Sequence, residues 1–382
     1  MTAPRSPSAF TYALRERLPL PVVASRVTTR APFVRETLSV PTALLLFIAA
    51  TLPAWAAGTW FAGVRILAAA GSEPDAAIGA WRMALAGMVP EAAGPAVVGL
   101  AFFLPVLLTA LVTGFVWEFL FAKLRARPVD CGILHTAWLF ALMLPAGAPL
   151  VTVAIGASFA FVAGKLLFGG TGRYLVSPAL LGIVFLYFAY PDTPSPTLAF
   201  PVDGARVQTA LDVALTGGVS ALGDAGHGLL PLALGDDLGA FGTTSAVACA
   251  LGALLLLAGG LASWRIVAAA LAGSLAMTLA LNTWGPDDPA FDLPWRWHLV
   301  TGSFAFLIAF IATDPVGASV TRVGRWIYGF LIGAAAILFR VANSSHPEGT
   351  IYAVLLVSLA APAIDYAVIA WQMRRHRRRL RP

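Results

Sequence analysis

The sequence predicts an all-α membrane protein that crosses the bilayer many times, and three observations favour this fold class. Apolar runs of spanning length recur from about residue 40 to about residue 372, and a spanning helix needs roughly 20 apolar residues. Hydrophobic residues make up 59% of the chain and charged residues only 12%, whereas a soluble domain carries about 25% charged residues. The mean hydropathy is +0.81. We therefore expect the 382 residues to form one transmembrane domain.

Ten apolar segments can be placed along the chain. They lie at about 40–64, 95–121, 132–147, 149–166, 168–190, 243–262, 265–283, 298–313, 325–341 and 350–372. Five is an odd number, so the first five and the last five segments run in opposite senses, as in an inverted repeat. Within the transmembrane domain at 39–373, we expect repeat one at about 39–190, an outer loop at 191–238 and repeat two at about 239–373. Residues 1–38 are expected to form a cytoplasmic extension, and 374–382 a basic cytoplasmic tail.

The charges of the loops predict the orientation, because cytoplasmic loops carry an excess of Lys and Arg. With the N-terminus inside, the inner side receives Lys123, Arg125, Arg127, Lys165, Arg173, Arg265, Arg322, Arg325 and the tail from Arg374 to Arg381. The outer side receives Asp192, Asp203, Asp212, Asp224, Asp236, Asp237, Asp287, Asp288 and Asp292. Both termini are then cytoplasmic. The net charge of +6 reflects this topology and does not indicate a nucleic-acid partner.

Two glycine-rich breaks interrupt apolar segments, one at 168–182 and one at 239–245. Non-helical backbone at membrane depth is tolerated only where protein or a water-filled cavity surrounds it, and paired breaks in two halves point to a transport site. Helix N-termini bind phosphate through their free N–H groups. The candidates for an anion site are Gly170, Gly172, Arg173, Thr244 and Ser245. The alternatives are close helix packing for the glycines and an inner-side anchor for Arg173.

Three carboxylates lie in or beside apolar segments, where charged groups are costly and often functional. Glu118 either belongs to an ion path or pairs locally with Lys123 and Arg125. Asp314 precedes Pro315, so a turn or helix cap is the alternative to an ion path. Asp365 lies in an apolar run and needs a partner or a cavity.

The remaining reactive side chains favour structural interpretations. His135 and His298 lie on apolar stretches and are expected to form structural hydrogen bonds. Cys131 and Cys249 form no metal-binding spacing and are expected to be buried small side chains. The sequence carries no haem-attachment motif, dinucleotide fingerprint or P-loop, and we predict neither a metal site nor a catalytic residue.

A series of motifs resembles the NqrB/RnfD family, the second subunit of the sodium-translocating NADH:quinone reductases and its RnfD relatives. In chain order they are Trp117-Glu118, Phe168-Gly-Gly-Thr-Gly-Arg173, Ser177-Pro-Ala-Leu180, Phe185-Leu-Tyr-Phe-Ala-Tyr-Pro191, Ser263-Trp-Arg-Ile266, Pro294-Trp-Arg-Trp-His-Leu299, Ala312-Thr-Asp-Pro-Val316, Trp326-Ile-Tyr-Gly-Phe-Leu-Ile-Gly333, Arg340-Val-Ala-Asn343, Pro347-Glu-Gly349 and Ala361-Pro-Ala-Ile-Asp365. The resemblance covers about residues 30–372. Because so many motifs occur in family order, the resemblance is specific.

The resemblance implies a fold of ten helices in two inverted five-helix repeats, like that of the urea transporters. It implies a bacterial inner-membrane subunit that works with other membrane and redox subunits. It also implies FMN joined by a phosphodiester to a Thr on the outer side, a sodium path through Glu118, Asp314 and Asp365, and a quinone region at Gly114 of the second helix. The chain is then a subunit of a translocase and not a complete enzyme.

The sequence departs from the family pattern near the implied sites. In the flavin-attachment motif, Asp203 and the acceptor Thr209 are kept, while Arg206, Val207 and Gln208 replace Ser or Thr, Gly and Ala. Covalent and non-covalent flavin therefore both remain open. In the two breaks, Tyr174 and Ser177 replace two Asn residues of the family, and Thr243 replaces a Glu.

Two functions from different classes follow. The first is an FMN-binding subunit of an Nqr/Rnf-like complex that couples electron transfer to movement of Na⁺ or H⁺. The alternative is a stand-alone transporter or channel on the same scaffold that has lost its covalent flavin, as the altered attachment motif suggests.

Overall fold

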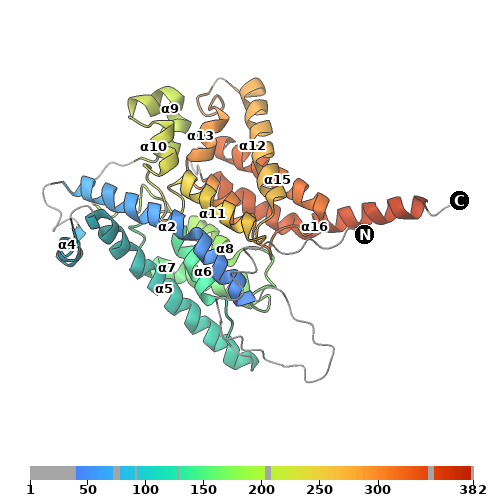
Figure 1. The fold of residues 1–382 in the computed structure, drawn as a ribbon, viewed down its shortest axis with the longest axis horizontal. Coiled ribbons are helices and arrows are strands. Elements are labelled where there is room, and N and C mark those ends of the chain that lie inside the picture. The colour runs from blue at the N-terminus through green and yellow to red at the C-terminus, as the bar shows by residue number, and fades with distance from the viewer. Residues whose placement is uncertain are drawn as a thin grey trace.

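The computed structural model describes residues 40–71, 78–90, 93–126, 129–202, 208–286, 288–342 and 348–379, which form helices joined by turns, with no β-strand among them (Figure 1). The elements are α2 (Val40–Ala70), α4 (Ala80–Gly87), α5 (Gly94–Arg125), α6 (Ile133–Leu142), α7 (Leu150–Phe161), η2 (Val162–Leu166), α8 (Pro178–Ala189), α9 (Ala210–Asp224), α10 (Leu229–Leu234), α11 (Ala246–Ala258), α12 (Trp264–Trp284), α13 (Trp295–Val300), α14 (Phe304–Phe306), η3 (Leu307–Ile311), α15 (Arg322–Ala342) and α16 (Gly349–Arg379). The predicted all-α class is confirmed for the described residues.

Five of the described helices, α2, α5, α12, α15 and α16, are long and apolar enough to cross a membrane. On α5, the exposed side chains of Leu104, Leu108, Val112 and Phe115 follow one another at intervals of three and four residues. That spacing places them on one face of the helix. An exposed apolar face of this length suits lipid and not water. The chain is therefore a polytopic membrane protein.

The other predicted spans correspond to shorter apolar helices, of which α6, α7, α8 and α11 are the longest. Helix α6 ends at Leu142, and Pro145, Gly147 and Pro149 follow it. Proline lacks a backbone N–H and its ring clashes with the preceding turn, so the helix cannot continue through this stretch. The segment predicted at 298–313 is likewise divided into α13, α14 and η3, with Gly302 at φ +64° between the first two.

The segment 191–238, which we predicted to be a polar loop, contains two helices, α9 and α10. Their apolar residues form a small second core with α13, as a cluster of Ala214, Leu222, Leu232, Leu293 and Trp297. Figure 1 shows α9, α10 and α13 together at one end of the molecule, away from the far end of α5. The apolar runs of α9 and α10 are short, are interrupted by glycine and lie among polar residues, so they do not resemble spanning helices.

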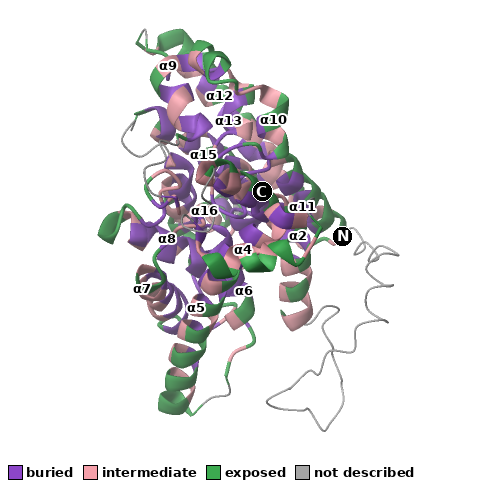
Figure 2. Cartoon of the chain, turned by 90° about the vertical axis from the view of Figure 1, so that its left-hand side faces the viewer, coloured by how far each residue is buried: buried purple, intermediate pink, exposed green. Residues whose placement is uncertain are grey.

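Small residues allow the long helices to cross closely. A side chain at Gly333 of α15 would overlap the backbone carbonyl of Ala270 in α12. A side chain at Gly63 of α2 would likewise overlap the carbonyl of Pro95 at the start of α5. Without a hydrophobic driving force between helices in lipid, such close approach supplies the packing energy. Figure 2 shows the buried residues gathered in the middle of the assembly and exposed residues along the outer faces.

Candidate functional site

The first glycine-rich break lies between η2 and α8. Gly170 adopts φ +104°, a conformation that only glycine adopts without strain. Its N–H donates to the carbonyl of Lys165 at 3.2 Å, and the N–H of Thr171 donates to Oδ2 of Asp130 at 2.5 Å. Helix α8 begins at Pro178 with Ser177 as its N-cap residue. Arg173, a candidate for the anion site, therefore lies in the break itself and not in the helix.

The second break docks against the first half of the chain. The N–H of Gly242 donates to the carbonyl of Leu142 at 2.7 Å, and the N–H of Phe241 donates to that of Leu144 at 3.2 Å. These carbonyls follow the end of α6, where the helix itself offers no partner. Ser245 caps α11 by accepting a hydrogen bond from Ala248 N at 3.1 Å. The break therefore joins the two halves at membrane depth.

Thr209, the predicted flavin acceptor, is the N-cap residue of α9 and is only 8% exposed. Its Oγ1 accepts a hydrogen bond from Asp212 N at 3.0 Å and donates one to Asp212 Oδ2 at 2.7 Å. The same Oδ2 accepts from the Thr209 backbone N–H at 3.3 Å. This reciprocal arrangement is a capping box. The loop charges predict Asp212 only as an outer-side acid, although Thr followed three residues later by Asp is a capping signature.

Asp203, the other residue kept from the attachment motif, lies outside the described residues, as does Arg206. The described part of the motif therefore consists of Gln208 and Thr209.

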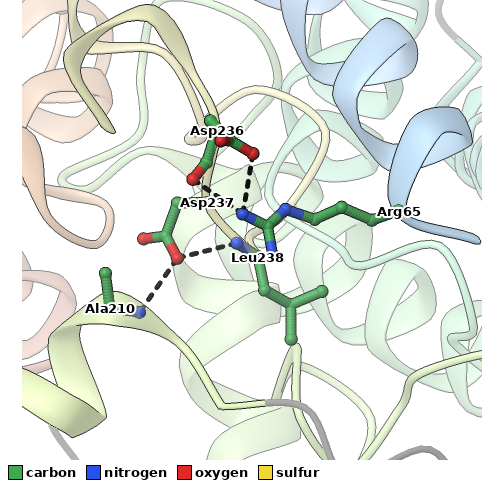
Figure 3. A network of polar contacts seen from close by, with 5 residues as sticks. All are labelled: Arg65, Ala210, Asp236, Asp237 and Leu238. Carbon is green, nitrogen blue, oxygen red and sulfur yellow. Dashed lines mark hydrogen bonds and ion pairs between the residues drawn. The ribbon is translucent and has the colours of Figure 1, made fainter. Parts of the chain in front are cut away.

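The buried carboxylate of Asp237 connects Ala210, the first residue of α9, to Leu238, the residue before the second break (Figure 3). Oδ1 of Asp237 accepts hydrogen bonds from Ala210 N at 2.9 Å and from Leu238 N at 2.7 Å. Burial raises the pKa of Asp237 to about 7, although the two backbone N–H donors and Arg65 act in the opposite direction. Arg65, near the end of α2, donates through Nη2 to the carbonyl and to Oδ1 of Asp236 at 2.7 and 2.9 Å.

A narrow crevice opens beside this network. Its lining includes Arg65, Asp237, Gly239 and Thr244. Two of its polar atoms, Nε of Arg65 and Oγ1 of Thr244, are buried and have no hydrogen-bond partner among the described residues. Its space of about 20 Å³ corresponds to roughly one water molecule. The crevice can take a small polar group and is too small for a flavin ring.

The two predicted halves of the anion site do not meet. Among the described residues, no hydrogen bond or ion pair joins Gly170, Gly172 or Arg173 to Thr209 or to the lining of the crevice. Arg65 of the crevice lies two residues after Gly63, which packs on the first turn of α5, so the crevice is near the start of that helix. Asp130, which bonds to the first break, follows the last turn of α5, so the first break is near its other end. The 23 residues between Pro95 and Glu118 span about 35 Å at 1.5 Å per residue, which exceeds the roughly 30 Å hydrocarbon core.

Glu118 pairs with a residue that we did not expect. Its Oε1 lies 2.5 Å from Nζ of Lys165, which is fully buried in η2. Oδ2 of Asp130 lies 3.3 Å from the same nitrogen. Lys123 instead lies over the ring of Phe119, and Arg125 donates to the carbonyl of Leu166. The sequence contains one signal for this pair, a single Lys in the apolar run 149–166. The distribution of loop charges alone assigns that Lys to the inner surface and does not predict its partner.

Asp130 lies in the turn before α6 and completes this cluster. Burial alone would raise the pKa of its carboxyl group, but Lys165 and the Thr171 side-chain and backbone donors lower it below the ordinary value. Asp130 is therefore charged, so the cluster contains one ammonium group and two acidic side chains.

Asp314 and Tyr174 bring the first break against the segment that follows η3. Oδ1 of Asp314 accepts a hydrogen bond from Val316 N at 3.0 Å and lies 3.4 Å from the Tyr174 hydroxyl, which donates to it. Both side chains are buried. Tyr174 supplies the phenol that faces Asp314. Among the described residues, Asp314 has no ion-pair partner.

Asp365 of α16 is bound to the start of α15. Its Oδ1 accepts hydrogen bonds from Ser319 Oγ at 2.7 Å, Thr321 Oγ1 at 2.6 Å and Thr321 N at 3.0 Å, and its Oδ2 accepts one from Val320 N at 2.8 Å. Acidic groups stabilise helix N-termini. These contacts hold the segment before α15, including Thr321, whose Oγ1 accepts a hydrogen bond from Gly324 N in the first turn of that helix. Asp365, Asp314 and Glu118 share no contact within the described residues.

Most of the other residues singled out from the sequence are buried. A side chain at Gly114 would overlap the ring of Phe161, whose centroid lies 5.8 Å from Lys165 Nζ. His135 and His298 are buried with Nδ1 unpartnered among the described residues. Cys249 is buried as expected, whereas Cys131 is exposed because it lies in the turn before α6. Within the described ranges, no three His, Cys, Asp or Glu side chains converge to hold a metal ion.

Comparison with known proteins covers nearly the whole chain. Residues 27–374 match the model of the NQR2, RnfD, RnfE family. The B subunit of the Na(+)-translocating NADH-quinone reductase of Pseudomonas aeruginosa is 41% identical over 360 residues, which are 91% of this chain and 89% of the relative. Its counterpart in Azotobacter vinelandii is 40% identical over 358 residues, with the same coverage. The counterpart in Klebsiella pneumoniae is 42% identical over 287 residues, 74% of this chain and 70% of the relative.

Proposed function

Since this chain belongs to the NQR2, RnfD, RnfE family, we propose that it is the membrane subunit of an Nqr/Rnf-like electron transport complex. In this proposal it binds FMN at Thr209 and couples electron transfer to translocation of Na⁺ or H⁺. The observation that carries the proposal is the match over residues 27–374. Relatives that are named as subunits of a sodium-translocating NADH-quinone reductase support it.

The residues around Thr209 fit attachment of a phosphate ester. Thr209 caps the N-terminus of α9, the end of a helix that favours a negative charge, although the N–H groups of Ala210 and Asp212 already donate to Asp237 and Thr209. Asp212 fixes the direction of the hydroxyl, and Arg65 supplies a cation with an unpartnered Nε next to the crevice. In this proposal the ester bond to Thr209 holds the phosphate end, and Arg65 supplies a positive charge at the crevice. When bound, FMN supplies a ring that accepts and releases electrons. The quinone region is proposed at Gly114, on the far part of α5.

The proposed architecture has ten membrane segments in two inverted repeats, 39–190 and 239–373, with both termini in the cytoplasm of a bacterium. The docking of one glycine-rich break on the end of α6 supports two interlocked halves. Lys123 and Arg125 lie in the last turn of α5, at the end opposite Asp236 and Asp237. This separation of charge supports a cytoplasmic location for the Lys165 end and an outer location for Thr209.

The cation path is proposed through Glu118, Asp314 and Asp365. Each is an acidic group within the membrane domain, where such groups are retained mainly for function or pairing. Because the three acidic groups have different partners, we propose three separate cation-binding positions along the path, called stations below, rather than one site. Electron input from NADH or another donor belongs to the partner subunits.

The test is co-expression of the chain with the other complex subunits and a flavin transferase. Wild-type protein is expected to fluoresce under ultraviolet light in a denaturing gel, Thr209→Ser to retain an acceptor hydroxyl, and Thr209→Ala to lose the signal. A flavin found only after native extraction would support non-covalent binding. No flavin after either extraction would contradict the proposal. Solute flux by the isolated chain in liposomes would then favour the stand-alone transporter.

A further inference from the structure

We infer that the ammonium group of Lys165 is the resident cation of a carboxylate site formed by Glu118 and Asp130. A free metal cation can occupy this site only when the lysine charge is removed or displaced. The inference rests on the proposed function in one respect, because it concerns the Glu118 station of the proposed cation path. The geometry itself does not depend on electron transfer.

The geometry is that of an occupied cation site. Nζ of Lys165 lies 2.5 Å from Glu118 Oε1 and 3.3 Å from Asp130 Oδ2. Lys165 is 0% exposed and Glu118 is 3% exposed, while Asp130 is 24% exposed. Oxygen ligands of a hard cation such as Ca²⁺ lie at about 2.3–2.6 Å, so the contact with Glu118 is within that range and the contact with Asp130 is longer. The lysine nitrogen therefore lies between the two carboxylates, beside Glu118, and a metal cation there would need Asp130 to move closer.

The chain is shaped to hold this nitrogen in place. Lys165 belongs to the π-helical turn η2, in which the N–H of Leu167 bonds to the carbonyl of Val162. Such wide turns often mark functional positions. Gly132 leaves the room that the ammonium group needs, because a side chain at Gly132 would come within 3.1 Å of Lys165 Nζ and would overlap Thr171 Oγ1.

The same nitrogen is connected to the first glycine-rich break. Asp130 Oδ2, its second carboxylate neighbour, also accepts the hydrogen bond from Thr171 N. The carbonyl of Lys165 accepts one from Gly170 N. A cation exchange at Glu118 and Asp130 would therefore act on Asp130, whose Oδ2 also fixes the backbone of the break through Thr171 N. This connection makes Lys165 a specificity-determining residue of the station rather than a passive surface charge.

The first experiment measures the melting temperature of the purified complex in sodium chloride and in choline chloride of equal concentration. Lys165→Met leaves two carboxylates without a cation, so sodium is expected to raise its melting temperature by several degrees through mass action. Wild type and Lys165→Arg, which keep the charge, are expected to show a smaller sodium-specific shift, because sodium can then stabilise the complex only at its other cation-binding positions. Adding Asp130→Asn to Lys165→Met is expected to reduce the shift. A sodium-specific shift in the wild type as large as in Lys165→Met, or a folded Lys165→Met without one, would overturn the inference.

The second experiment uses dicyclohexylcarbodiimide, which reacts with protonated carboxyl groups in apolar surroundings, with the modified residue located by mass spectrometry. Glu118 is expected to remain unmodified in the wild type and in Lys165→Arg. In Lys165→Met it is expected to react and to be protected by sodium. Reaction of Glu118 in the wild type would contradict a resident lysine cation, even if Lys165→Met fails to fold. Neither readout needs flavin or electron transfer, so failure of the proposed function would be seen separately as missing flavin fluorescence.

Discussion

The hydroxyl of Thr209 donates a hydrogen bond to Asp212 Oδ2 at 2.7 Å and accepts one from the Asp212 backbone N–H at 3.0 Å. One side chain thus serves two purposes, because the proposed flavin acceptor is also the cap of α9. Thr209→Ala, which removes the proposed flavin acceptor, would also remove the cap. The two contributions must therefore be separated by a second substitution.

Asp212→Ala separates the acceptor from the cap. It keeps the Thr209 hydroxyl and removes the carboxylate that completes the capping box. Loss of a cap costs about 1 kcal/mol, so we expect Asp212→Ala and Thr209→Ala to lower thermal stability by similar amounts, while Thr209→Ser lowers it less. Melting temperatures in detergent would measure this. If only Thr209→Ala loses flavin fluorescence, the acceptor role is distinguished from the capping role; loss in both variants would show that attachment needs the fixed hydroxyl.

Asp237 gives the protein a pH-dependent stability. Its pKa rises from an ordinary 3.8 to about 7 in the folded protein, so between these values the folded state binds more protons than the unfolded state. The free energy of unfolding then falls as pH rises from about 4 to about 7, and levels off above. Asp237→Asn keeps an oxygen for Ala210 N and Leu238 N without the charge. Its melting temperature should exceed the wild-type value increasingly from pH 5 to pH 8.

The difference in melting temperature between the wild type and Asp237→Asn at each pH isolates the titration of Asp237, because all other titratable groups are present in both proteins. Arg65 and Glu348 act on Asp237 in opposite directions, and both remain in the variant. Parallel melting curves over the whole pH range would contradict a buried carboxyl group with a raised pKa. Asp237→Ala should be less stable at every pH, since it leaves two buried backbone donors without an acceptor.

The pair Glu118 and Lys165 should behave as one unit in a double-mutant cycle. Removing one partner of a buried ion pair costs about 3–5 kcal/mol, because the other charge is left uncompensated. We expect Glu118→Gln and Lys165→Met each to be strongly destabilising and the double variant to be less destabilised than the sum. Lys123→Met is the control, since Lys123 contacts the Phe119 ring and forms no ion pair with Glu118. Additive effects of the two substitutions would mean that the pair is not coupled.

The crossing of α12 and α15 depends on a glycine. Gly333→Ala places a methyl group against the backbone carbonyl of Ala270, which cannot rotate away as a side chain could. We expect a loss of about 1–3 kcal/mol or more, as for overpacked cores, seen as a lower melting temperature. Gly87→Ala in α4 is the control, because no heavy atom lies within 4 Å of the added carbon. That change should be neutral or stabilising by up to about 1 kcal/mol; equal losses in both variants would contradict the crossing geometry.

Much of the fold could be predicted because its signals are local. The hydropathy of the chain located α2, α5, α12, α15 and α16 to within a few residues, except where α2 and α16 extend further. Glycine and proline runs located both breaks. The helices α9 and α10 were not predicted, because their few apolar residues are buried against residues far away in sequence, in the small second core and in the main core. Arg173 lies before α8 and not within it, because Pro178 begins that helix.

The sequence by itself determined that this protein lies in a membrane, which family it belongs to and where its backbone is interrupted, since each depends on residue type and order. Tertiary structure decided which groups meet. It placed Lys165 against Glu118 and Asp130, Asp365 before the start of α15, and Asp237 against Ala210 in the crevice that Arg65 also lines. It also placed Thr209 and the first break at opposite ends of α5. These outcomes depend on contacts between residues distant in the chain, in a medium where a buried charge must find its partner.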